Sequence, residues 1–505
     1  MKPFNTALGH GLVPLAAALL LAGCTVGPDY HGAPQAAPVA ANAAAFNRAP
    51  QGTVATAPVA AAWWRALNDP QLDALVDAAL RNSPDLHAAE ARVRQARAGL
   101  TAQQRNELPK VQASAGYLRS RSPNLESLEG SESAASSGGG PIGFYLAGFD
   151  ASWELDIFGG TRRAIEAASA EADASQADLA DSHVQLAAEV AQAYVGLRDE
   201  QQRVAIAHES ADLEARILTL TEQRRARGVA SDLDVERIRS QVENTLASII
   251  PLDAQVDESL DELAVLTGRE PGALDAELAA PKPLPTLPAS VAVGDPARLL
   301  RQRPDIRAAE RRLASQNAQI GEHEADWFPK VTLFGDLSFS AAEPGHLFRK
   351  SNYTWLGVPY LQWNVLDFGR TQASVDQAKA GRDEAEAKYE NTVLGALKDA
   401  DVALSRYGHE RENALSLREV EDSATHAAVL TEQRYRAGTT TALDWLDAER
   451  TRYSAEQNRI QSDAQLIKDY VALQKSLGLG WETPGETSAG LPAGTSAEVP
   501  AGMPG

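Results

Sequence analysis

The sequence predicts a mainly α-helical chain with a few short strands, built from two copies of one unit. Three observations predict this fold: two collinear regions resemble each other, each contains a long stretch without proline, and each contains two short segments of alternating polarity. The chain has 505 residues, a formal net charge of −21 and 44% hydrophobic residues. This composition excludes a disordered chain and a helical membrane bundle, and the acidity argues against nucleic-acid binding.

The first 23 residues have the pattern of a secretory signal peptide. Lys2 precedes an apolar stretch at residues 11–23, which is too short to cross a bilayer as a helix. The single cysteine, Cys24, follows Leu-Ala-Gly directly, so the chain can form no intramolecular disulfide and no CxxC site. Ordinary cleavage beside an incidental cysteine is the alternative. Residues 24–68 are rich in Ala, Pro and Gly and are expected to form an N-terminal tether.

The rest of the chain is a tandem duplication. Residues 82–90 match residues 302–310, and Leu-Pro-Lys-Val at 108–111 matches Phe-Pro-Lys-Val at 328–331, both at an offset of 220. Further along the offset is 210, where Trp153, Phe158 and Gly159 align with Trp363, Phe368 and Gly369. Collinear matches of this length define repeats. The repeats span 69–268 and 297–480, with a proline-rich linker at 269–296 and a disordered tail expected at 481–505.

Each copy is expected to contain long helices. Residues 161–227 and 371–437 contain no proline, and at 1.5 Å per residue each would form a helix about 100 Å long. Such lengths are typical of coiled-coil packing. The helix that follows the first of them has an apolar residue every seven positions (Val235, Val242, Ile249, Val256, Leu263). Pro251 lies inside this run and is expected to kink or end it.

Four segments of period-2 alternation are expected to be strands, at about 111–120, 144–156, 331–340 and 353–366. Alternation over about ten residues with aromatic ends is typical of a membrane barrel strand. An ordinary antiparallel sheet packed on one face shows the same pattern. The smallest membrane barrel needs eight strands. If the four segments are barrel strands, the barrel must therefore be shared between chains.

These features resemble the outer membrane factor family, the TolC and OprM exit ducts, and most closely its NodT-like lipoprotein branch. The residues that carry the resemblance are Cys24 with Gly-Pro-Asp-Tyr at 27–30, the tryptophan pair at 63–64 with Asp-Pro-Gln-Leu at 69–72, the Phe-Gly strand ends, and the paired helix ends at 224–228 and 434–438. The resemblance implies a Cys24 acylated three times and anchored in outer membrane lipid. It also implies a homotrimer with a twelve-stranded barrel over a twelve-helix α-barrel.

The same resemblance implies partners and a transport function. The family docks to a periplasmic adaptor (a membrane fusion protein) and to an inner-membrane pump, commonly of the resistance-nodulation-division class. Drugs or metal ions are the implied cargo, conducted passively to the exterior, and no cofactor is implied. The turns of the long helices carry the expected sites: Gly228 and Gly438 match adaptor-docking turns, and Asp444 and Asp447 match an aspartate constriction.

A gate lock is the remaining implied site. Tyr435 matches a family tyrosine that helps to lock the closed tunnel, and Asp234 matches the acidic residue across that lock. The family often has an arginine two residues beyond the second glycine, where this chain has Thr440. From the residues alone, Asp234 and Asp444 also fit capping boxes, and the two glycines fit helix C-caps, so a purely structural role stays open.

Three other functions fit the sequence less well. An adaptor-type lipoprotein has one helical hairpin beside domains rich in short strands, whereas this chain has two hairpins and few strands. A structural coiled-coil lipoprotein without a pore does not need the alternating aromatic segments. No HExxH, GxSxG or Walker-type motif supports an enzyme, and Asp232 with Asp234 is a weak metal signature without further ligands.

Overall fold

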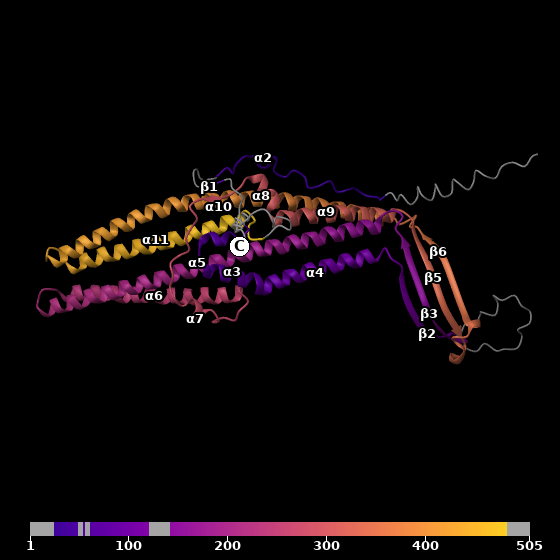
Figure 1. The fold of residues 1–505 in the computed structure, drawn as a ribbon, viewed down its shortest axis with the longest axis horizontal. Coiled ribbons are helices and arrows are strands. Elements are labelled where there is room, and N and C mark those ends of the chain that lie inside the picture. The colour runs from indigo at the N-terminus through magenta and orange to yellow at the C-terminus, as the bar shows by residue number, and fades with distance from the viewer. Residues whose placement is uncertain (1–24, 49–53, 56–60, 121–141, 482–505) are drawn as a thin grey trace, which may run out of the picture. The chain divides into compact units, whose positions relative to one another are not determined.

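The computed structural model describes residues 25–48, 54–55, 61–120 and 142–481 (Figure 1). The expected signal peptide, Cys24 and nearly all of the expected tail lie outside these residues. The chain forms two compact units, each drawing on both copies of the repeat. The sheet unit comprises Met1–Pro34, Arg92–Gln176 and Ala308–Glu390, and the hairpin unit comprises Gln35–Ala91, Ala177–Arg307 and Asn391–Gly505.

The sheet unit contains four antiparallel strands in chain order, β2 (Lys110–Ser120), β3 (Ile142–Leu155), β5 (Lys330–Ala341) and β6 (Tyr353–Gln362) (Figure 1). Each copy contributes one hairpin, and pairing of β3 with β5 joins the two copies. No described side chain of these four strands is buried. The sheet therefore does not pack one face on this chain's own core, which is what an ordinary half-buried sheet would do.

Strand β6 is shorter than the alternation predicts, because it ends at Gln362 instead of residue 366. The equivalent residues of the first copy, Trp153–Leu155, belong to β3 because they pair with the neighbouring strand β5. Strand β6 pairs only with β5, and that pairing stops where Lys330 meets Gln362.

Helices make up most of the remaining described chain. The long ones are α5 (Gly160–Ala226) with α6 (Asp232–Leu266), and α10 (Arg370–Arg436) with α11 (Ala442–Ser476). The others are α2 (Pro38–Ala41), α3 (Pro70–Asn82), α4 (Pro84–Arg105), α7 (Asp275–Leu278), α8 (Pro296–Gln302) and α9 (Pro304–Glu324). Short strands β1 (Val54–Ala55) and β4 (Val291–Ala292) pair in parallel. Among the helices that the structure describes, none combines the length and the apolar character needed to cross a membrane.

The sequence predicts that Pro251 kinks or ends its helix, but α6 continues past this residue to Leu266. Ile249 and Leu252 on either side are buried against Ala207 of α5, so packing on the apolar seam holds the helix across the missing backbone hydrogen bond. Elsewhere in the hairpin unit, Trp63 is buried between Trp64 and Tyr470, with ring centroids at 5.7 and 6.1 Å. The tryptophan pair therefore anchors the packing.

Candidate functional site at the helix tips

The two long helices end in turns of the same geometry. Gly228 follows α5 and Gly438 follows α10, with φ angles of +74° and +73°. The next residue in each turn donates its amide to a carbonyl of the last helical turn, Val229 to Arg224 and Thr439 to Arg434, both at 2.9 Å. This left-handed arrangement is a Schellman C-cap, so both glycines have the capping role that the sequence predicts.

Each returning helix begins with the predicted capping box. In α6, the amide of Asp234 donates to Ser231 Oγ at 3.1 Å, and the amide of Ser231 donates to the Asp234 carboxylate at 3.0 Å. In α11, Thr441 and Asp444 repeat this pair at 3.1 and 3.0 Å. The hydrogen bonds from Ser231 hold the pKa of Asp234 below its usual range. Both carboxylates therefore stabilise helix starts.

Asp444 receives more hydrogen bonds than Asp234 does. Its Oδ2 accepts from the hydroxyls of Thr440 and Thr441, each at 2.7 Å, in addition to the Thr441 amide. The Thr440 hydroxyl, followed by the amide and hydroxyl of Thr441, lowers the pKa of Asp444 to about 2. Thr440, at the position where the family often has an arginine, thus helps to keep the aspartate ionised.

Asp447 lies one turn further along α11 and is also exposed. Its Oδ1 accepts a hydrogen bond from Arg450 Nη2 at 2.8 Å, and both side chains are more than half exposed. An exposed ion pair of this kind adds little stability. It does place a positive charge beside Asp447, so the two candidate constriction residues differ: Asp444 is held by neutral donors and Asp447 by a cation.

Tyr435 lies at the end of α10 between two partners that the sequence did not reveal. Its ring stacks on Trp445 with centroids 5.1 Å apart, and the Arg224 guanidinium carbon lies 4.8 Å from its ring centroid. Arg224 belongs to the first hairpin, so this cation–π contact joins the two tips. In the described part of the chain, no contact joins Tyr435 to Asp234.

An apolar cluster fixes the two tips to each other. Trp445 and Leu446 of α11 are buried against Ile217 of α5 and Ile238 of α6. A lone tryptophan in the first turn of a highly charged helix was the available sequence signal for this cluster. Because the tips share one core, movement of one hairpin must disturb the other.

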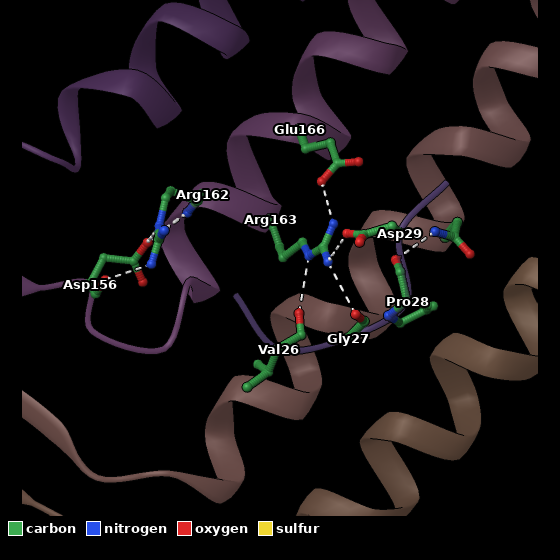
Figure 2. A network of polar contacts seen from close by, with 9 residues as sticks. Val26, Gly27, Pro28, Asp29, Asp156, Arg162, Arg163 and Glu166 are labelled. Atoms are coloured by element: carbon green, nitrogen blue, oxygen red, sulfur yellow. Dashed lines mark hydrogen bonds and ion pairs between the residues drawn. The ribbon is translucent and has the colours of Figure 1, made fainter. Parts of the chain in front are cut away.

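The residues that follow Cys24 are bound to the start of α5. We call residues 25–30 the strap. Figure 2 shows the Arg163 side chain reaching the strap, where it donates to Val26 O at 3.0 Å, to Gly27 O at 3.1 Å and to Asp29 Oδ1 at 2.7 Å. Arg163 is buried, and Glu166 one turn along α5 holds its remaining side at 2.7 Å. The hydrogen bond from Arg163 lowers the pKa of Asp29.

Two further contacts hold the strap. The amide of Val26 donates to Phe158 O at 3.1 Å, and Asn317 of α9 donates to Pro28 O at 2.9 Å. The first described residues of the expected N-terminal tether are therefore bound to α5 and α9. Thr25 is the only residue between Cys24 and Val26 in the sequence.

Comparisons with known proteins agree with this architecture. The chain matches the family described as outer membrane efflux protein over residues 75–269 and 296–479, which correspond to the two repeats. It is 31% identical to Nodulation protein T of Rhizobium leguminosarum bv. trifolii, covering 92% of this chain and 96% of that protein. It is 32% identical to outer membrane protein OprJ of Pseudomonas aeruginosa, covering 94% and 96%.

A solved structure gives the same fold. The outer-membrane channel OprN is 36% identical, with a TM-score of 0.78 over 91% of this chain and all of that chain. These matches confirm the family and the fold that the repeats and the alternating strands predict. The family consists of channels and not of enzymes. The chain therefore belongs to the outer membrane efflux protein family, and it is an outer-membrane efflux channel with a long helical periplasmic part.

Proposed function

We propose that the chain forms a homotrimer whose three sheets close into one twelve-stranded barrel over a twelve-helix tunnel. The observation that carries this proposal is the sheet itself: none of its described side chains is buried, and its edge strands β2 and β6 each pair on one side only. An open edge in a bilayer leaves backbone groups without hydrogen bonds, which costs several kcal/mol per group. Closure through further copies of the chain removes both edges.

The tips supply the narrow end of the duct. Asp444 and Asp447 of three chains form a periplasmic constriction of six carboxylates that attracts cations and repels anions. The support for this role is that both side chains are exposed and that Asp444 stays ionised at any physiological pH. Capping and lumen roles are compatible, because one carboxylate oxygen can bond the helix start while its charge acts on the pore.

Tyr435 and Asp234 lie on the two sides of the resting lock, and within one chain each is held by its own neighbours without a direct contact between the two. Tyr435 is held in place by Trp445 and Arg224, and Asp234 by its capping box. Thr440 does not supply the charged partner that an arginine would give. The closed state of this duct therefore depends on aromatic packing at the tips more than on ion pairs.

The turns at Gly228 and Gly438 dock a periplasmic adaptor, which connects the duct to an inner-membrane pump of the resistance-nodulation-division class. Exposed arginines surround both turns (Arg225, Arg227, Arg434, Arg436). Relatives are named for the export of pyoverdine and of toluene. Such varied cargo is consistent with selection by the pump and adaptor, while this chain conducts passively without a cofactor or a catalytic step.

Lipidation at Cys24 attaches the protein to outer membrane lipid. The support is the Leu-Ala-Gly-Cys sequence together with the strap, which brings the residue after Cys24 to the start of α5 beside the sheet. A fixed strap places an acyl anchor at a defined level, in contrast to a long flexible linker.

Single-channel recording tests the proposal. The lipidated wild type in a planar bilayer is compared with Asp444→Asn plus Asp447→Asn, and with Asp253→Asn on α6 as a matched exposed control. We expect small cation-selective openings that lose selectivity only in the double variant. Selectivity unchanged by the double variant would restrict both aspartates to structural roles. Absence of any channel from folded protein would contradict the pore and favour a structural or adaptor-type lipoprotein.

A further inference from the structure

The two faces of the four-stranded sheet differ in composition. Residues directly opposite each other on neighbouring strands point to the same side, so the strand pairing assigns each side chain to one face. Apart from Arg119 near the end of β2, one face carries only apolar, aromatic or glycine residues. The other face carries every carboxylate of the described strands, namely Asp150, Glu154 and Asp336. In a membrane barrel the uniformly apolar face meets lipid, so we call the face with the carboxylates the lumen face.

Four large apolar or aromatic side chains nevertheless lie on the lumen face. Phe334 of β5 is directly opposite Val358 of β6, and Leu356 and Tyr360 flank Val358 on the same side of β6. We call these four residues the apolar strip. Their exposed fractions are 40% for Phe334, 50% for Leu356, 38% for Val358 and 57% for Tyr360. A group of exposed apolar side chains beside polar ones is typical of a contact site for another molecule.

The first copy of the repeat shows that a strand hairpin forms without such a strip. Its hairpin has the same register as that of the second copy. Offsets of 220 and 210 give the equivalent residues of the first hairpin, which are Ser114 for Phe334, Gly148 for Val358 and Asp150 for Tyr360. The folding of a hairpin therefore does not account for the three apolar side chains of the second copy.

Two carboxylates border the apolar strip. Asp150 of β3 lies directly opposite Asp336 of β5, and Asp336 lies directly opposite Leu356. Like charges in this position destabilise a sheet. Each aspartate accepts one hydrogen bond from a serine hydroxyl, Ser114 to Asp150 at 3.1 Å and Ser338 to Asp336 at 2.7 Å. Among the described residues no ion pair involves either aspartate, so a cation from outside the chain would relieve their repulsion.

We propose that this part of the lumen face is a contact site for organic cations with an apolar body. The apolar strip packs on the body, and the Asp150–Asp336 pair attracts the charge. Charge complementarity selects this class of solute, because an inorganic cation would leave the strip uncovered and an anion would add a third negative charge. The rings of Phe334 and Tyr360 also attract cations through their faces. The inference rests on the proposed trimeric duct and names a substrate class for it.

Single-channel recording of the full lipidated protein tests the site with three probes. Benzyltriethylammonium has both a ring and a positive charge, tetraethylammonium lacks the ring, and benzenesulfonate has the ring with a negative charge. We expect benzyltriethylammonium to reduce the current at a lower concentration than either of the others. Phe334→Ser with Tyr360→Ser should raise that concentration roughly 10-fold and leave the value for tetraethylammonium unchanged.

A matched control separates the strip from the rest of the lumen face. Leu118 of β2 is an exposed apolar side chain on the same face, directly opposite Phe144 and outside the strip. Leu118→Ser should therefore leave the effect of all three probes as in the wild type.

Asp336→Asn tests the charge with a variant of nearly the same shape. Because it removes the repulsion from Asp150, we expect it to unfold thermally at or above the wild-type temperature, while it weakens the block by benzyltriethylammonium. A purely structural role for Asp336 predicts the reverse, a loss of stability with an unchanged block.

The outcomes separate the site from the proposed function. A block that is unchanged in Phe334→Ser with Tyr360→Ser, or equally weakened in Leu118→Ser, would overturn the inference and leave the duct intact. A block that depends only on Asp444 and Asp447 would place the contact at the tips and would also overturn it. Absence of any channel from folded protein would contradict the duct itself, and the inference with it.

Discussion

Replacing Arg163 by alanine is expected to release the strap from the start of α5. The Arg163 side chain is only 5% exposed, and its guanidinium donates to two strap carbonyls, Val26 O and Gly27 O, and to Asp29. The Asp29 side chain is 72% exposed, so water replaces that bond at small cost. A bond from a charged donor contributes about 1.5 kcal/mol or more, so loss of the two carbonyl bonds weakens docking by about 3 kcal/mol, roughly 100-fold.

Hydrogen exchange at the Val26 amide measures this effect directly, because that amide donates to Phe158 O only when the strap is docked. We expect exchange at Val26 to rise roughly 100-fold in Arg163→Ala. Arg162→Ala is the matched control, since Arg162 bonds Asp156 at 3.1 Å (Figure 2) and makes no strap contact that the structure describes. Unchanged exchange in Arg163→Ala would refute the reasoning, as would an equal rise in the control, which would indicate general opening of the helix start.

Three more predictions concern the tips. Gly438→Ala places a Cβ at φ +73° in open space, so it should cost about 1 kcal/mol of backbone strain in denaturant unfolding, and a stability equal to wild type would contradict the C-cap. Trp445→Ala removes a buried ring from the shared cluster and should cost about 3–5 kcal/mol, whereas the exposed Val229→Ala should cost little in the same assay; equal losses would argue against the cluster. The pKa of Asp444 is about 2, below its unfolded value, so its stabilising effect is complete above about pH 4 and is lost as pH falls toward 2. Asp444-dependent cation selectivity should therefore survive from pH 7 to pH 4, and its disappearance between those values in bilayer recordings would contradict the capped geometry.

Local features of this chain were predictable from sequence, and long-range contacts were not. The capping boxes at Ser231 and Thr441 and the C-cap at Gly438 depend on residues within a few positions of each other. They can therefore be predicted from the local sequence. The Arg163–Asp29 pair joins residues 134 positions apart, and no spacing rule reports such a pair. The end of β6 was missed because strand length depends on neighbouring strands, which a single segment does not encode.

The two copies of the repeat have the same backbone geometry, but they differ in the residues that pack over their strand-to-helix turns. Strand registers, capping boxes and turn glycines are the same in both copies. At the strand-to-helix turns, by contrast, Arg163 holds the strap over the first copy, and its equivalent in the second copy is Ala373. At the second turn Phe368 is 91% exposed, and nothing lies within 4 Å of the position that a Cβ would take at Gly369. Divergence at position 163 thus determines which of the two turns holds the strap, although both turns have the same glycine geometry, with φ +83° at Gly159 and +86° at Gly369.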